Sequence, residues 1–257
     1  MATFRLLHEN LWATLTTALT ASTEASALPV GATQHPDRLY VWRSTTNADE
    51  DTIDADFGSA QAVSMVAVAN LKLKAGGSLV IESRGTASSP GSATTLATIT
   101  AQDDGTRVAV ALFASTTLRH LRLRWTNPDS MLDYAEVGFV GAGVPFTPEA
   151  GNIGGPAAWK LRDPSVRVGS IDGQITTTSR TPYRTGVFSW EYLEETDYTA
   201  ITNEVFAAIG SRTPVFVVVD EDRGWFQVLA RLDADLDAPL LQPEGLYAIS
   251  VPWEEAR

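Results

Sequence analysis

The feature that most constrains the fold lies between residues 39 and 73, where an alternating segment precedes a valine-rich one. Apolar and polar residues alternate over residues 52–57, which is typical of a β-strand with one buried and one wet face. Residues 63–69 are apolar at nearly every position, which predicts a second strand covered on both faces. Gly58 predicts a turn between them. The whole stretch therefore predicts the centre of a β-sandwich.

Further short strands are predicted along the next seventy residues. The clearest is 120–125, where Leu121, Leu123 and Trp125 alternate with polar residues, so this strand is expected to be half buried. Roughly eight strands before residue 141 are a number suited to a jelly roll or sandwich. The remaining predicted strands cover residues 78–83, 96–100, 106–112 and 134–140.

The domain organisation follows from a break in this pattern. Residues 141–158 are rich in Gly and Pro and have no periodicity, which predicts a linker. Strands follow, with one helix over residues 194–210, where apolar residues repeat at helical spacing and Gly210 ends the run. We therefore expect a mainly β protein: an N-terminal arm (1–38), a jelly-roll β-sandwich (39–140), the linker (141–158), and a second small β domain with one helix (159–257).

Composition excludes several classes of function. The net charge of -12 disfavours nucleic acid and anionic lipid as partners, because both are polyanions. The absence of cysteine excludes disulfides and thiolate sites. No apolar run is long enough for a membrane span, and the N-terminus lacks the features of a signal peptide. We expect synthesis in the cytoplasm without a leader.

The motifs of catalysis and cofactor binding are not met. Residues 169–173 (GSIDG) fail the nucleophile pattern, and residues 138–143 (GFVGAG) have the wrong glycine order for a dinucleotide site. The three histidines are far apart in the sequence, and His120 is expected to be a solvated surface residue. We therefore expect no catalytic residues, no cofactor and no enzyme activity.

A loop rich in acidic residues is the one candidate for a calcium site. Hard cations require several oxygen ligands, but the order of oxygens typical of an EF-hand is not present. Asp54 and Asp56 are explained by strand alternation alone, so no metal site is predicted. The other oxygen-bearing residues of this segment are Asn47, Asp49, Glu50 and Asp51.

The order of features around Trp42 is similar to that of a known family. Trp42, a loop, an alternating strand that ends at Phe57 and Gly58, and a valine-rich strand resemble the discoidin-like, galactose-binding-like jelly roll. In particular, they resemble its form near the N-terminus of tail-tip proteins of long-tailed, siphovirus-type bacteriophages. One departure is residues 69–71, where Ala-Asn-Leu stands and the phage domains would have His-Asn-Leu.

The second half resembles a domain of distal tail or minor tail proteins of the same phages. The matching features are an aromatic strand (187–193), one helix, the Pro-Val-Phe-Val-Val-Val strand from Pro214, and a Gly-Trp-Phe-Gln-Val strand after an acidic turn. The resemblance implies a structural virion protein of the tail tip or baseplate that assembles as a ring, a hexamer or a trimer. Its partners would be itself and other tail-tube and tail-tip proteins.

Two surface sites are predicted on these grounds. Trp253 in the final strand is a candidate for an inter-subunit contact, with packing inside its own domain as the alternative. The alternative function is a carbohydrate-binding adhesin that recognises host surface glycans, because jelly rolls of this kind often hold sugars at loop tips. Four residues near predicted strand ends are its candidate contacts, namely Arg38, Arg84, Trp125 and Asn127.

Overall fold

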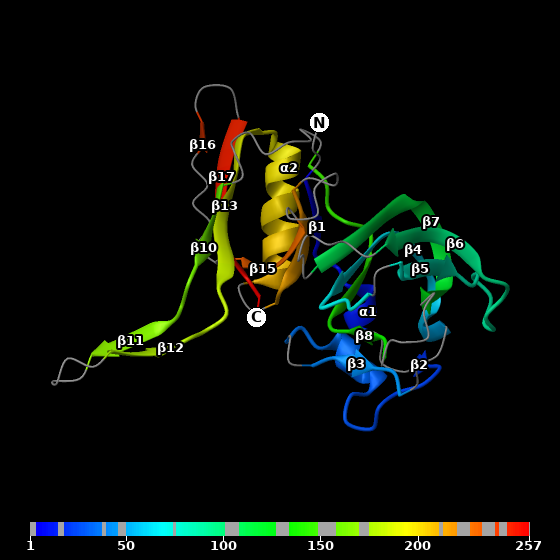
Figure 1. Cartoon of the computed structure of the whole chain (residues 1–257). Coiled ribbons are helices and arrows are strands. Elements are labelled where there is room, and N and C mark those ends of the chain that lie inside the picture. Colours follow the sequence, from blue (N-terminus) through cyan, green and yellow to red (C-terminus); the bar gives the residue numbers. More distant parts are fainter. Residues whose placement is uncertain are drawn as a thin grey trace. The chain divides into compact units, whose positions relative to one another are not determined.

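The computed structural model divides the chain into two compact units (Figure 1). The first unit comprises Met1–Pro148 with Val215–Leu229, and the second comprises Glu149–Pro214 with Ala230–Arg257. Each unit is described by itself. The described residues are 4–14, 18–37, 40–45, 50–73, 76–100, 108–126, 134–148, 158–169, 175–210, 213–219, 227–232, 240–241 and 246–256.

Two long strands form the centre of the first unit. The two strands predicted within residues 52–69 are one strand, β4 (Glu50–Ala69), which pairs antiparallel with β7 (Val108–Thr126). The predicted turn at Gly58 is a bulge, because the register against β7 shifts between Asp56 and Gln61 and Gly58 has a φ of 72°. Glycine accepts this angle because it has no Cβ. The chain therefore continues through the bulge instead of reversing.

The main sheet of the first unit has the strand order β2–β4–β7–β5–β6, and β9 pairs with the other end of β4. A short pair, β3 with β8, the pairing of β1 with β14, and the first three residues of β15 (Gln227–Leu232), which lies next to β14, complete the described strands of this unit. The bounds are β1 Arg5–Leu7, β2 Leu19–Ala21, β3 Trp42–Arg43, β5 Ser78–Ser83, β6 Thr94–Thr100, β8 Glu136–Val137, β9 Val140–Gly143 and β14 Val215–Val218. The jelly-roll-type, mainly β fold class is confirmed.

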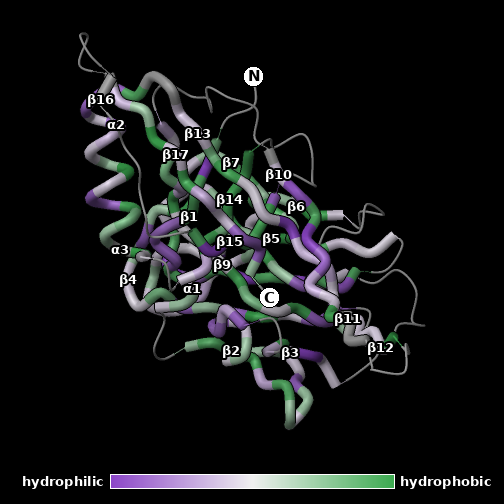
Figure 2. Tube along the Cα trace, turned by 90° about the vertical axis from the view of Figure 1, so that its left-hand side faces the viewer, coloured by the Kyte–Doolittle hydropathy of each residue, from purple (hydrophilic) through white to green (hydrophobic). Residues whose placement is uncertain are grey.

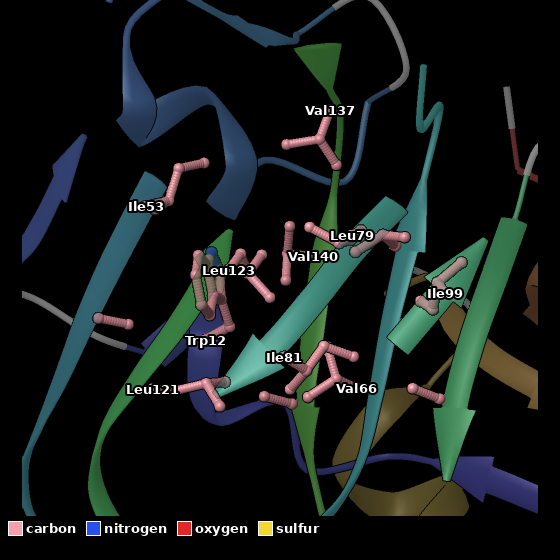
Figure 3. Packing of buried hydrophobic residues seen from close by; sticks show 14 of the residues in the cluster. Trp12, Ile53, Val66, Leu79, Ile81, Ile99, Leu121, Leu123, Val137 and Val140 are labelled. Atoms are coloured by element: carbon pink, nitrogen blue, oxygen red, sulfur yellow. The ribbon is translucent and has the colours of Figure 1, made fainter. Parts of the chain in front are cut away.

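Three fully buried tryptophans anchor the core of the first unit. Figure 3 shows one of them, Trp12, packed among aliphatic side chains of the sheet. Trp12, from the short helix α1 (Leu11–Thr14), donates its indole N–H to Thr33 in the 3-10 helix η1 (Val30–Gln34) at 3.0 Å. Trp42 packs against Trp125 with ring centroids 5.1 Å apart. The predicted N-terminal arm therefore contributes a central core residue, since Trp12 lies within the same hydrophobic cluster as Trp42 and Trp125.

Part of the predicted linker belongs to the sandwich. Its first residues, Gly141 and Gly143, lie in β9, and residues 149–157 are outside the described part of the chain. A Cβ on Gly141 would stand 2.7 Å from ring carbons of Phe216 and 2.8 Å from Leu7. These glycines are present because neighbouring side chains and backbone approach β9 closely, a reason that composition alone does not distinguish from flexibility.

The second unit contains a sheet with the strand order β15–β17–β13–β10, to which β15 contributes Ala230–Leu232, and β16 also pairs with β17. A separate two-stranded hairpin, β11 with β12, is inserted between β10 and β13. The bounds are β10 Ala158–Arg162, β11 Val166–Gly169, β12 Ile175–Thr178, β13 Tyr183–Leu193, β15 Gln227–Leu232, β16 Leu240–Leu241 and β17 Leu246–Glu255.

The helix predicted over residues 194–210 is present in the second unit. It consists of α2 (Glu195–Thr199), a π-helical stretch η2 (Ala200–Phe206) and α3 (Ala207–Ile209), and it ends at Gly210, whose φ is 56°. In Figure 2 apolar and polar residues alternate along it, as expected for an amphipathic helix. Tyr198 stacks on Tyr247 of β17 at 4.1 Å between ring centroids, which fixes the helix to the sheet.

Candidate functional site

Charged residues occupy the outer face of β4 and β7. The alternation that buries Ile53 and Leu123 places Asp54 opposite Arg122 on the other face. The two oxygens of Asp54 accept hydrogen bonds from Nε and Nη2 of Arg122, each at 2.9 Å. Asp54 also accepts a bond of 3.2 Å from Arg84. The predicted wet face is therefore a set of paired charges rather than a row of isolated ones.

The same arrangement continues at both ends of this face. Asp56 accepts two hydrogen bonds from Arg119, at 2.7 and 2.9 Å. The bond from Arg119, with a smaller contribution from the Gly58 N–H, lowers the pKa of Asp56 to about 2 against the opposing effect of burial. At the other end, Arg124 lies 2.7 Å from Glu82. Both carboxylates are held by arginines, and the low pKa of Asp56 makes that carboxylate a poor general acid or base at neutral pH.

A loop closes over one end of this face. Arg84, at the start of the loop, donates to the carbonyl of Gly91 at 3.2 Å, and its backbone N–H bonds to the carbonyl of His120. His120 Nε2 lies 3.0 Å from the carbonyl of Ala87. The prediction of a solvated His120 is wrong, because the loop leaves only 7% of the residue exposed. The imidazole has a structural contact instead.

Two of the four residues predicted for glycan contact, Trp125 and Arg84, lie within the described residues. Trp125 is fully buried in the core and offers no surface to a ligand. Its neighbour in sequence, Asn127, and Arg38 lie outside the described residues. In the sheet register Ser78 pairs with Thr126, whereas Ser83 pairs with Leu121, so Arg84, which follows Ser83, lies at the opposite end of the strands from Thr126. Proximity to a strand end in the sequence did not reveal at which end of the sheet a residue lies.

Four connections of the first unit leave from the same end of its sheet. Glu50, at the start of β4, pairs with Thr126, at the end of β7. Thr126 also pairs with Ser78, at the start of β5, and Ser78 pairs with Thr100, at the end of β6. The four strand ends therefore lie side by side, and each leads into one of these connections. Asn127 is the first residue of one of them.

The acidic segment does not form a metal site in the part of the chain that the structure describes. No group of three or more His, Asp or Glu side chains there is placed to hold an ion. Asp51 accepts hydrogen bonds from Ser22 and Thr23, at 3.3 and 3.1 Å, and is buried. Asn47 and Asp49 lie outside the described residues. The calcium alternative thus gains no support from the geometry.

Trp253 packs within its own unit. It is 8% exposed and stacks on Phe188 with ring centroids 5.2 Å apart. This is the placement that the alternative prediction described, and it leaves little of the ring for a neighbouring subunit. The same sheet carries a pocket of about 540 Å³, with Arg162, Thr185, Leu232, Arg231, Pro252, Trp253 and Glu254 as its lining.

The described helices give no membrane-spanning segment, since none is both long and apolar enough to cross a bilayer. No protein-family model matches the chain. A search of curated proteins gives no match either.

Several solved structures with a similar fold are carbohydrate-binding modules. A chitosan-binding module of a chitosanase/glucanase from Paenibacillus sp. IK-5 is 23% identical, with a TM-score of 0.45 over 52% of this chain and 98% of the module. A family 32 module of NanJ from C. perfringens, solved with galactose, is 14% identical, with a TM-score of 0.41 over 54% of this chain and 98% of the module. These similarities concern the fold of about half of the chain and identify no ligand for it. Neither they nor the structure shows a phage tail protein, and that interpretation stays a prediction.

Proposed function

We propose that this protein is a non-catalytic carbohydrate-binding protein whose first unit recognises glycans at one end of its β-sandwich. The observation that carries the proposal is the common end of β4, β5, β6 and β7, where four connections are anchored. A packed core with three buried tryptophans supplies the rigid support that binding loops need. The described charged side chains on the outer face of β4 and β7 form ion pairs with one another. The loop end is therefore favoured over this face as the binding site.

The sequence of these connections suits sugar hydroxyls. Residues 46–49, 101–107 and 127–133 contain Asn, Asp, Gln, Thr, Ser and Arg side chains, which donate and accept hydrogen bonds to neutral polyols. Of the four predicted contact residues, Asn127 directly follows Thr126 in the sequence, at this end of the sheet, and Arg84 directly follows Ser83, at the other end. We therefore retain Asn127 as a proposed contact and assign Arg84 to the ion-paired face, where it bonds to Asp54.

A glycan array probed with the full chain tests this proposal, followed by calorimetric titration of the best oligosaccharide. Chitotriose and galactose are the first single ligands to use, because similar modules are solved with them. Asn127→Ala is expected to weaken binding about tenfold, the loss of about one hydrogen bond in a desolvated site. Arg84→Ala is the matched control and should leave the affinity unchanged. An array without any saturable binding would contradict the proposal.

A second proposed function is a structural subunit of a phage tail tip, made in the host cytoplasm and assembled into the virion tail. One observation favours it: exposed apolar side chains concentrate on the β10–β13 side of the second unit, as at a subunit interface. Its proposed partners are further copies, in a ring of six or three, and other tail-tube and tail-tip proteins. Immunogold labelling of purified phage particles tests it, and labelling confined to the tail end is the expected result. Particles without the chain would contradict it.

A further inference from the structure

One segment of the second unit is unusually apolar for an exposed surface. Five of the seven exposed large hydrophobic residues in the described chain lie within residues 158–187. We call this segment the arm; it is distinct from the N-terminal arm of residues 1–38. Scattered single apolar residues are normal on a protein surface, whereas a group of them indicates an interaction site. The five are 37% to 73% exposed, namely Trp159, Leu161, Val166, Ile175 and Val187.

The arm also has an open backbone edge. β10 is the last strand of its sheet and pairs only with β13 among the described residues. Trp159 and Leu161 are two residues apart on β10, so their side chains point to the same face. An exposed edge strand with apolar side chains is a template for contact with another chain. Figure 1 shows the β11–β12 hairpin continuing outward from the far end of β10 and β13, which extends this surface.

The charge of the arm is opposite to that of the rest of the chain. Residues 158–187 carry five Lys or Arg and two Asp, and the remainder carries 14 Lys or Arg and 29 Asp or Glu. The arm thus has a net charge of +3 on a protein whose remainder is -15. Such complementarity favours association of the arm with an acidic surface. Anionic membranes fit less well, because the other 227 residues would be repelled from them.

We propose that the arm of one copy docks on the acidic surface of a second copy of this chain. Trp159 and Leu161, on one face of β10, supply apolar area, which Val166 and Ile175 extend along the hairpin, whereas Val187, paired with Ala158, points to the other face. The basic residues of the arm select the acidic partner. Arm-to-arm pairing is disfavoured because it brings together two segments of like charge, so the contact is heterologous and each copy offers both surfaces. Such contacts build a ring or a filament rather than a dimer. This inference rests on the assembly role proposed above and is independent of glycan binding.

Light scattering coupled to size exclusion measures the association of the full chain. In low salt the mass should rise with concentration to at least about three times the monomer mass, the minimum for a closed heterologous ring. In about 1 M salt, where the Debye length is about 3 Å, it should fall. A chain that stays at 27.6 kDa at every concentration, or that stops at a dimer, would overturn the proposal.

Two arm variants separate the apolar contribution from the charged one. Leu161→Ser with Ile175→Ser, and separately Arg162→Glu with Arg180→Glu, should each weaken association at least about tenfold, the ordinary cost of losing interface contacts. The control, Val144→Ser with Lys72→Glu, changes exposed residues of the same kinds in the first unit and should associate as the wild type does. Equal loss in the control would overturn the assignment to the arm.

A photo-crosslink tests the contact without weakening it. The chain has no cysteine, so Ile175→Cys gives a single attachment point for a benzophenone maleimide. Irradiation should link the arm to acidic segments of a second copy, identified by mass spectrometry. Crosslinks within one copy only, or capture of the chain by vesicles of anionic phospholipid without self-association, would overturn the proposal. Virion labelling is a separate readout, so failure of self-association and failure of the tail-tip function are distinguishable.

Discussion

Gly141 provides the sharpest test of how the first unit is built. The sequence places this glycine in a linker, and the structure places it in β9, paired with β4. An alanine Cβ would lie 2.7 Å from two ring carbons of Phe216 and 2.8 Å from Leu7, well inside van der Waals contact. Phe216 is buried and stacked on Phe139 at 5.5 Å, so it has little room to move.

Gly141→Ala is therefore expected to lower the free energy of unfolding by about 1–3 kcal/mol, the usual cost of overpacking a core. At about 2–4 °C per kcal/mol for a unit of this size, the melting temperature should fall by about 2–12 °C. Urea unfolding followed by tryptophan fluorescence, together with calorimetry, measures both quantities. Only the transition of the first unit should shift.

Gly31→Ala is the matched control. A Cβ at Gly31 would meet no atom within 4 Å, and the backbone there has no positive φ, so this change should stay within about 0.5 kcal/mol of the wild type. If Gly141→Ala were equally harmless, the close packing of β9 would be refuted, and the interpretation of residues 141–158 as a flexible linker would be restored.

The remaining predictions concern single side chains. Because the pKa of Asp56 is 3.8 when unperturbed and about 2 in the folded chain, its stabilisation is present above pH 3.8 and is lost as the pH falls toward 2. After discounting for solvent screening this is about 1 kcal/mol, and Asp56→Asn should remove that part of the acid dependence, as measured by urea unfolding from pH 5 to 2. Trp125→Ala should cost about 3–5 kcal/mol in the same assay, whereas Trp159→Ala should cost under about 1 kcal/mol, because only Trp125 is fully buried. Equal costs would contradict the burial difference.

Local periodicity predicted much of the fold. The alternation around Ile53 and Leu123 was enough to assign the buried and wet faces of the two central strands, because each side chain's face depends only on its position along the strand. The helix was predicted for the same reason, since Ile201, Val205 and Ile209 recur at intervals of four residues and all are buried.

Features that depend on contacts between distant segments could not be predicted. Glycine is common in turns, which is why a turn was predicted at Gly58. The pairing of β4 with β7 makes it a bulge instead, and the paired residues of β7 lie more than fifty residues away in the sequence. Gly141 is explained only by Leu7 and Phe216, which come from opposite ends of the sequence. His120 is covered by a loop that contacts it through the carbonyl of Ala87, which lies 33 residues away in the sequence.

The candidate site was likewise predictable only where local pattern decides the outcome. Strand alternation places Trp125 on the same side as Leu121 and Leu123, and this pattern was a sufficient signal that the ring is buried. The proximity of Arg84 to a strand end did not indicate which end of the sheet it occupies, because that depends on the register between β5 and β7. The exposed apolar residues of the arm have ordinary strand composition, so only their exposure identifies them.

Hydrogen exchange with and without a bound oligosaccharide tests the central claim most directly, because it locates the ligand on the intact chain. We expect ligand-dependent protection next to Glu50, Ser78, Thr100 and Thr126, the four strand ends at this end of the sheet, and no change around Arg84 or His120 at the other end of the same strands. Protection confined to the Arg84 end, or to the second unit, would contradict the proposed glycan-binding site.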